Sequence, residues 1–214
     1  MRAAILEAAT GYIAAHGYGR ATLAIIAAEA GVSRGAITHH YASKADLAGA
    51  VVEHIYYKRM TLLLRRMKEL TERQRVEENL AVEVLWESYD SREYKAFLQL
   101  NAATLTDPDL LAVFVPKVRQ QEATWAVEVN RVFSEWEDNA EALWVTGDLL
   151  KAVLDGMLLN RHIWDEPQRE ARLRALVAGI VVQLRDRKIA MPTDQETERF
   201  IPMTERGARR PRRG

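Results

Sequence analysis

Hydrophobic side chains recur at helical spacing along almost the whole chain, and the clearest pair of such stripes lies in residues 22–47. The first stripe consists of Leu23, Ile26, Ala27 and Ala30. It stops at Gly31, a residue type that tolerates the left-handed backbone of a tight turn. Ile37 and Tyr41 then give a short second helix its apolar face, and the Ser33 hydroxyl is placed to cap that helix. The pattern predicts a helix-turn-helix.

The outer face of the second predicted helix carries one basic, several polar and two very small residues. We expect Arg34 to read a base edge in the major groove of DNA, while Gly35 and Ala36 let the helix backbone approach the bases. Further hydrogen-bond donors on this helix are Thr38, His39 and His40. The face therefore predicts recognition of duplex DNA.

Contacts to DNA phosphates are expected where the helices of this region begin. Thr22 and Ser33 each precede a predicted helix, and we count both hydroxyls among the DNA-binding groups. Ser43 and Asp46 predict a capping box for the next helix, with Lys44 in its first turn. Because a lysine there opposes the helix dipole, it indicates an external anion such as a phosphate. A purely capping role is the alternative for Thr22.

The run AGVSRGAITHHYASKADL resembles the recognition region of the tetracycline-repressor (TetR) family of bacterial transcription regulators, whose pattern is roughly AGVSxGxIYxHFxxKxxL. The resemblance covers about residues 1–50 and extends over three helices. Thr38 stands where the family usually has a tyrosine, and His39 occupies the aromatic position beside it. A core hairpin without a DNA role is the alternative, but such a hairpin does not need a turn glycine, a capping serine and two basic residues together.

The remaining sequence also follows helical spacing, and no alternating strand pattern competes with it. An uninterrupted pattern from Ser43 to about Leu70 predicts one long helix that joins two domains. Its far end carries a basic cluster that we expect to form a solvated surface, with a reach toward DNA as the alternative: Lys58, Arg59, Arg65, Arg66 and Lys68. Further helices are predicted over residues 76–89, 91–105, 108–136, 139–164 and 168–186.

The fold class is therefore all-α. We expect a helix-turn-helix DNA-binding domain at residues 1–50, a helical ligand-binding and dimerisation domain at 51–187, and a polar, basic tail at 188–214. The tail is expected to be mobile, and its arginines are either solvated or add sequence-independent DNA affinity.

Several residues predict where the helices of the second domain begin or bend. Asp90 with Glu93 predicts a capping box, and Asp107 followed by Pro108 predicts an N-cap with proline in the first turn. Pro116 lies inside a predicted helix, so we expect a kink or a helix boundary there.

All five tryptophans lie in this second domain. In a helical bundle such side chains either fill the core or line a ligand cavity, and core packing is the simpler explanation for any single one. The resemblance to TetR regulators implies a small-molecule effector. The residues that we expect around it are Trp86, Tyr89, Phe97, Asn101, Trp125, Trp144 and Asn160.

The last two predicted helices are the most apolar and contain Gly147, Gly156 and Gly179. Glycine inside a helix costs about 1 kcal/mol relative to alanine, which indicates close approach of another helix. In the TetR family these helices form a four-helix dimer interface. The resemblance thus implies a homodimer through residues 139–164 and 168–186, bound to a pseudo-palindromic DNA operator.

The net charge of zero conceals a separation along the chain. Residues 1–75 hold 11 Lys and Arg against 6 Asp and Glu, residues 76–205 hold 14 against 24, and residues 206–214 hold 5 against none. A basic head on an acidic body is the pattern expected of a DNA-binding protein whose second domain stays off the DNA. Chance segregation on solvated faces is the alternative.

The chain contains no cysteine, which excludes disulfide scaffolds, zinc fingers and thiol catalysis. No apolar run reaches the roughly 18 residues of a membrane span, and the start is not a signal peptide, so we expect a cytoplasmic protein without membrane association.

The leading hypothesis is a homodimeric transcriptional repressor that a small apolar or amphipathic ligand releases from DNA. A DNA-tethered helical protein that binds another protein, without a small-molecule ligand, is the alternative. We expect no enzyme, cofactor or metal site, because the chain lacks a glycine-rich phosphate loop, histidines at metal-binding spacing and a nucleophile motif.

Overall fold

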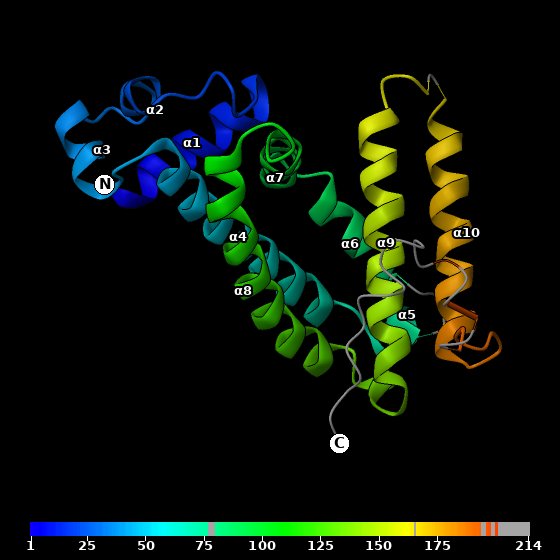
Figure 1. Ribbon diagram of the computed structural model, residues 1–214. Coiled ribbons are helices and arrows are strands. Elements are labelled where there is room, and N and C mark those ends of the chain that lie inside the picture. Colours follow the sequence, from blue (N-terminus) through cyan, green and yellow to red (C-terminus); the bar gives the residue numbers. More distant parts are fainter. Residues whose placement is uncertain (77–79, 165, 194–195, 198–199, 201–214) are drawn as a thin grey trace.

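The computed structural model describes residues 1–76, 80–164, 166–193, 196–197 and 200. The helices are α1 (Arg2–His16), α2 (Leu23–Glu29), α3 (Arg34–His40), α4 (Lys44–Glu69), α5 (Glu72–Val76), α6 (Ala81–Tyr89), α7 (Arg92–Ala103), α8 (Pro108–Val132), the 3-10 helix η1 (Ser134–Asn139), α9 (Ala140–Asn160) and α10 (Pro167–Arg185). The described residues include no β-strand, which confirms the all-α class (Figure 1). None of these helices is both long enough and apolar enough to cross a membrane.

The helix-turn-helix is formed by α2 and α3, and local hydrogen bonds fix both helix starts. The Thr22 hydroxyl accepts a hydrogen bond from the Ile25 amide at 3.2 Å, and the Ser33 hydroxyl accepts one from the Ala36 amide at 3.1 Å. Gly31 has a φ of 66°, the left-handed backbone that its position predicted. The capping roles of Thr22 and Ser33 are therefore confirmed.

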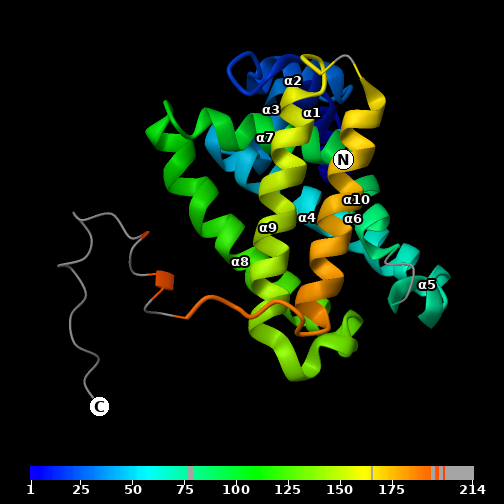
Figure 2. The same ribbon diagram turned by 90° about the vertical axis from the view of Figure 1, so that its right-hand side faces the viewer.

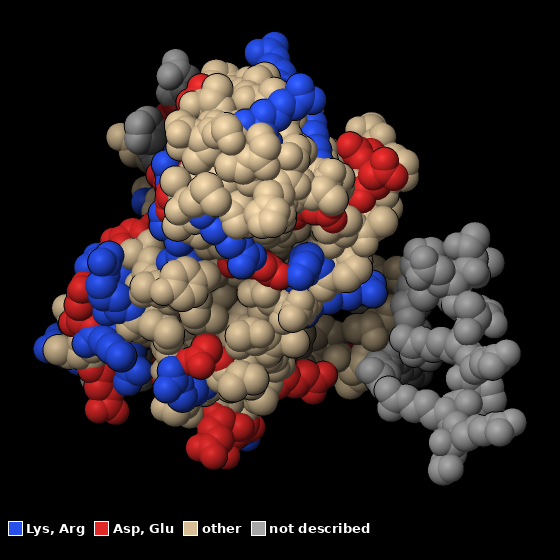
Figure 3. Space-filling model, turned by 90° about the vertical axis from the view of Figure 1, so that its left-hand side faces the viewer, with Lys and Arg blue, Asp and Glu red and all other residues tan. Residues whose placement is uncertain are grey.

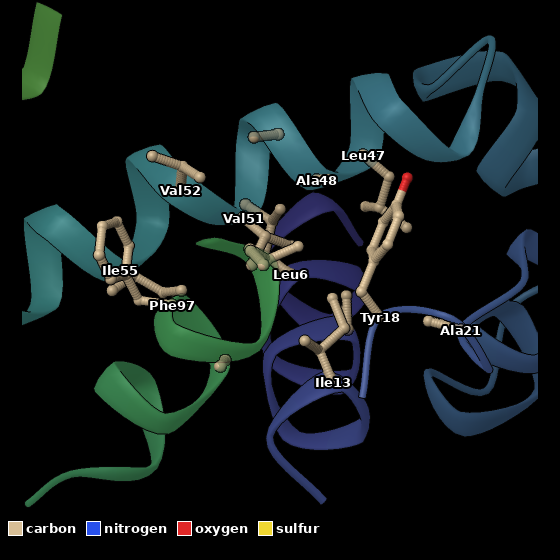
Figure 4. Packing of buried hydrophobic residues seen from close by; sticks show 14 of the residues in the cluster. Leu6, Ile13, Tyr18, Ala21, Leu47, Ala48, Val51, Val52, Ile55 and Phe97 are labelled. Carbon is tan, nitrogen blue, oxygen red and sulfur yellow. The ribbon is translucent and has the colours of Figure 1, made fainter. Parts of the chain in front are cut away.

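A buried core joins this head to the start of α4 and to α7. Ile13 of α1 faces Tyr18 and the α4 side chains Leu47 and Val51, and Phe97 of α7 lies farther along α4 (Figure 4). The head therefore packs against the body through a continuous apolar cluster, which limits how freely the two parts can move.

The long helix α4 packs against α8 over much of its length. An ideal Cβ on Gly49 would lie 2.7 Å from Cγ1 of Val113, so the glycine permits a close crossing of the two helices. The helix boundary considered at Pro116 is wrong, because α8 continues through it to Val132. Proline has no amide hydrogen, so Pro116 cannot donate a hydrogen bond to the Ala112 carbonyl one turn earlier. Both residues are exposed, so water can donate to that carbonyl instead.

The start of α7 corrects one predicted cap, and the start of α8 confirms another. Ser91, rather than Asp90, caps α7 by accepting a hydrogen bond from the Tyr94 amide at 3.1 Å. Asp90 instead accepts one from Nη1 of Arg161 at 2.7 Å, a tertiary contact without a local sequence signal. Asp107 caps α8 through the Leu110 amide at 2.8 Å, as expected.

Helices α9 and α10 stand side by side and form the outer layer farthest from α3 (Figures 1 and 2). Their bounds agree with the predicted segments 139–164 and 168–186 to within a few residues, apart from the turn that follows Asn160. Most of the tail expected at 188–214, and Asp165 of the predicted break, lie outside the described residues.

Candidate functional site

The outer face of α3 presents the side chains that the sequence assigned to DNA. Its solvent-exposed residues are Arg34, Gly35, Thr38, His39 and His40, and Ala36 is half-buried. Ile37 is fully buried and anchors the opposite face of the helix. Figure 3 shows this end of the molecule, where Lys and Arg lie at the margins of a largely uncharged surface.

The hydroxyl groups of the candidate DNA surface already make local hydrogen bonds. Thr38 Oγ1 donates to a carbonyl of its own helix, that of Arg34 at 3.0 Å or Gly35 at 3.2 Å. Thr22 and Ser33 act as acceptors at the helix starts, and both remain exposed. Thr38 therefore retains acceptor capacity, whereas the two capping hydroxyls retain an O–H group that can donate outward.

Lys44 makes an intramolecular contact that the sequence pattern did not reveal. Its Nζ donates a hydrogen bond to the Gly19 carbonyl at 3.2 Å and lies 3.9 Å from the centroid of the Tyr18 ring. Burial lowers the pKa of Lys44 and raises the pKa of Tyr18 to about 12. The lysine thus fastens the loop before α2 to the start of α4, while its ammonium group has further donors for an external anion.

A cavity of about 280 Å³ lies within the body, lined by residues of α4, α6, α7, α8 and α9, among others. Four of the residues expected around a ligand line it: Tyr89, Phe97, Trp125 and Trp144. The other three lie elsewhere. The Trp86 ring packs beneath the guanidinium groups of Arg161 and Arg174, Asn160 donates to the Gly156 carbonyl at 2.7 Å, and Asn101 is exposed.

Arg59 corrects the expectation that the basic end of α4 is a solvated surface. Its side chain is only 6 % exposed and lines the cavity. Its guanidinium carbon lies 4.2 Å from the Tyr94 ring centroid, 4.7 Å from that of Tyr89 and 5.4 Å from that of Trp125, and its Nε donates to Ser88 Oγ at 3.0 Å.

The apolar stripe of α4 contains the signal that could have located Arg59. The buried positions of this stripe are Val52, Ile55, Tyr56, Leu63 and Met67. Arg59 falls between Tyr56 and Leu63 at helical spacing, so it lies on the buried face, whereas Arg65 lies on the exposed one.

Several polar atoms point into the cavity region without an intramolecular partner. Within the described residues, the buried atoms that make no hydrogen bond include Arg75 Nε, Glu135 Oε2 and Thr146 Oγ1, and all three residues line the cavity. Burial raises the pKa of Tyr56 and of Tyr94, so both phenols stay neutral. The cavity therefore combines aromatic walls with unsatisfied polar groups, which is the composition of a small-molecule site.

Comparison with known proteins identifies the head. Residues 5–51 match the family model described as bacterial regulatory proteins, tetR family. The chain is also 25 % identical over 169 residues to the HTH-type transcriptional regulator BetI of Proteus mirabilis (strain HI4320), a match that covers 76 % of this chain and 80 % of BetI. Residues 5–51 are therefore similar to the DNA-binding region of tetR-family regulators.

Solved structures share the fold over most of the chain. The multidrug binding protein EbrR complexed with imidazole is 21 % identical, with a TM-score of 0.60 over 91 % of this chain and 97 % of EbrR. The SmeT-triclosan complex is 22 % identical, with a TM-score of 0.56 over 85 % of this chain and 89 % of SmeT. The family resemblance of the helix-turn-helix run is thus confirmed, and the chain is a DNA-binding transcription regulator.

Proposed function

We propose that this protein is a repressor that binds operator DNA as a homodimer and is released when a small apolar or amphipathic molecule occupies the body cavity. The observation that carries the proposal is the course of α4. This helix begins at Lys44, beside the recognition helix, and lines the cavity with Arg59, fifteen residues later. At about 1.5 Å per residue, these positions are about 22 Å apart on one rigid element.

A ligand can release DNA only if it binds the released conformation more tightly than the DNA-bound one. A molecule wedged against α4 would displace the helix that holds the head. In a dimer, this displacement changes the distance between the two recognition helices, which has to match the spacing of the major groove. The ligand-bearing structures of EbrR and SmeT support a role for the body in holding small molecules.

The face formed by α9 and α10 is suited to a second copy of the chain. Large apolar side chains are exposed along it, including Leu159 at 59 % and Leu176 at 61 %. A Cβ on Gly156 or Gly179 would meet no atom within 4 Å in the described part of the chain, whereas Gly147 lines the body cavity. Gly156 and Gly179 therefore leave room for a neighbouring helix that this single copy does not supply.

A dimer also suits the DNA that one helix-turn-helix can read. A single recognition helix contacts too few base pairs for selectivity, whereas two related by a twofold axis read half-sites about one helical turn apart. We therefore propose a pseudo-palindromic operator, read by Arg34 with its neighbours on α3. Because a bacterial operator lies in the cytoplasm, this function places the protein there.

The proposal is tested by selecting an operator from random duplexes with the full chain and measuring its affinity with and without a panel of aromatic and aliphatic compounds. At least one compound should raise the melting temperature and weaken operator binding about 5- to 150-fold. If no compound does either, and a protein partner is recovered on the same body, the chain is instead a DNA-tethered interaction factor. The cavity with its unsatisfied polar groups favours the small-molecule function.

A further inference from the structure

Arg59 is a buried cation without an acidic partner. Of the other cationic groups at the cavity, Lys151 is paired with Asp155 and Arg185 with Asp186, while Arg75 donates from Nη1 to the Val132 carbonyl at 3.3 Å. Arg59 donates from Nε to the Ser88 hydroxyl, and its remaining N–H groups have no acceptor among the described residues. No carboxylate among the described residues forms an ion pair with Arg59. A guanidinium removed from water without a counter-charge is unfavourable, so its retention here calls for a binding partner.

The surroundings of Arg59 define the rest of that partner. The rings of Tyr94 and Phe97 are stacked, with centroids 5.4 Å apart and an angle of 22° between their planes, and both line the cavity. Trp125 packs edge-on against Tyr56 with centroids 6.2 Å apart. These walls are flat and apolar, which suits a ring system or a hydrocarbon chain next to the charged group.

We propose that Arg59 binds the anionic group of an aromatic or otherwise apolar effector, so that the effector of this regulator is an organic acid. The inference rests on the proposed function, because it assigns the ligand of the same cavity. A carboxylate matches the planar fork of the guanidinium and can accept two parallel hydrogen bonds from it. The cavity's volume of about 280 Å³ suits a small bicyclic molecule better than a long acyl chain.

The rings of Tyr89, Tyr94 and Trp125 do not favour a cationic ligand, because the guanidinium of Arg59 already lies over them. The guanidinium of Arg59 lies over the faces of three rings, where an ammonium group would otherwise bind. A second cation there would be repelled at short range in a medium of low dielectric constant.

Two of the three acidic residues that line the cavity are screened by water. Glu122 and Asp148 are exposed, which weakens their field. The third, Glu135, lies in η1, whereas Arg59 lies in α4. Asp155 accepts a hydrogen bond from the Tyr94 hydroxyl, and its charge is paired with that of Lys151.

A head-group series tests the proposal with the full-length protein. Isothermal titration calorimetry compares naphthalene-2-carboxylate, 2-naphthylmethanol and 2-naphthylmethylammonium, which share one ring system and differ in charge. The carboxylate should bind at least about ten-fold more tightly than the alcohol, and the ammonium compound should bind most weakly. The matched variants are Arg59→Gln and Arg65→Gln, which remove one positive charge each from the buried and the exposed face of α4.

In Arg59→Gln the preference for the carboxylate should vanish while the affinity for the alcohol stays the same, which also shows that the cavity persists. Arg65→Gln should retain the full preference. If circular dichroism shows that Arg59→Gln is unfolded, Arg59→Lys replaces it and should reduce the preference, because ammonium lacks the bidentate fork.

Equal affinities of wild type for the carboxylate and the alcohol, tighter binding of the ammonium compound, or a preference that survives in Arg59→Gln would each overturn the inference. In all three outcomes the body still binds a small molecule, so the proposed function is not contradicted. If none of the three compounds binds, although the protein still binds its operator, the inference fails, whereas the proposed function is decided by the wider compound panel.

Discussion

The carboxylate of Glu7 in α1 accepts a hydrogen bond from Nζ of Lys58 in α4 at 2.8 Å. The same carboxylate bonds Nη2 of Arg92 in α7 at 2.6 Å and Nε2 of His54 in α4 at 2.9 Å. One acidic side chain of the DNA-binding head is therefore held by two helices of the body. Together with the apolar core below it, this cluster resists rotation of α1 against α4.

The cluster predicts a contribution to stability that depends on pH. The hydrogen bond from Lys58, reinforced by Arg92 and His54 and opposed by burial, lowers the pKa of Glu7 to about 2. Because the folded pKa lies below the unfolded value of about 4.3, the stabilisation is fully present above pH 5 and is lost as the pH falls toward 2. The carboxylate is 41 % exposed, so we expect less than about 1 kcal/mol.

Urea unfolding of wild type and Glu7→Gln at pH 7 and pH 3 measures this contribution. The variant should be less stable than wild type at pH 7, and the difference should shrink at pH 3. Glu29→Gln, which changes an exposed acid of α2, serves as the control. A deficit of Glu7→Gln that is the same at both pH values would show that the carboxylate's charge does not carry the effect.

Replacement by alanine should change the stability of the fold in opposite directions at Gly49, where α4 crosses α8, and at Gly11 in α1. In Gly49→Ala the new methyl would lie 2.7 Å from Cγ1 of Val113, a β-branched side chain with little rotamer freedom in a helix, so we expect a loss of about 1–3 kcal/mol. In Gly11→Ala the nearest atom, Nη1 of Arg92, would be 3.7 Å away. That variant should gain up to about 1 kcal/mol from helix propensity. Thermal unfolding of both variants distinguishes them, and a stabilised Gly49→Ala would contradict the close crossing.

The helix-turn-helix could be predicted from the sequence because its determinants are local. Thr22 and Ser33 cap helices only three residues away, and Gly31 supplies the turn between them. The partners of Glu7 and Arg59 could not be predicted in this way. Glu7 is 51 residues from Lys58, and the rings around Arg59 come from three other helices, so both clusters depend on how the helices cross.

The cavity shows the same limit. Aromatic composition left core packing and a ligand cavity as alternatives, and the observed cavity is lined by Tyr89, Phe97, Trp125 and Trp144, among others. The sequence could not show that Trp125 lines the cavity and Trp86 does not, because both occupy apolar positions of helices. Trp86 is kept out of the cavity by Arg161 and by α10, which pack around its ring.

Arg34 and Lys44 should affect DNA binding in different ways. If Arg34 contacts a guanine, Arg34→Ala costs about 1–3 kcal/mol and relaxes specificity at one position per half-site. Lys44→Ala should weaken binding to all sequences alike and lower the salt slope by about one unit per lost phosphate contact. Because Lys44 also holds the Gly19 carbonyl, its variant should lose some thermal stability as well. Affinities for the operator and its single-base variants at several salt concentrations separate the two roles, and equal loss of specificity in both variants would contradict them.

The exposed face of α9 and α10 predicts the oligomeric state. Leu159→Glu places a charge on the face proposed for the dimer, near the C-terminal end of α9, where burial without a partner is unfavourable, so the variant should sediment as a monomer. Leu105→Glu makes the same change at a leucine that is 85 % exposed between α7 and α8 and should leave the dimer intact. Sedimentation velocity measures both. Monomeric wild type, or a Leu159→Glu variant that still dimerises, would remove this face as the interface.

The positions of two tryptophans allow a final test of whether effectors enter the cavity. Trp125 lines the cavity, and its ring packs against Tyr56 and the guanidinium of Arg59. Trp86 lies outside it, enclosed by Arg161 and Arg174. A compound that weakens operator binding should therefore quench the fluorescence of Trp86→Phe as it quenches wild type. Trp125→Phe should lose part of the quenching, because Trp136 and Trp144 also line the cavity.

Both substitutions keep an aromatic ring, so the fold and the operator affinity without ligand should change little in either variant. Of the two variants, Trp125→Phe alone should change the ligand response, because Trp125 lines the cavity and Trp86 does not. If instead Trp86→Phe abolishes the quenching and Trp125→Phe retains it, the effector binds near Arg161, outside the cavity, and the coupling to DNA does not run through the part of α4 that carries Arg59.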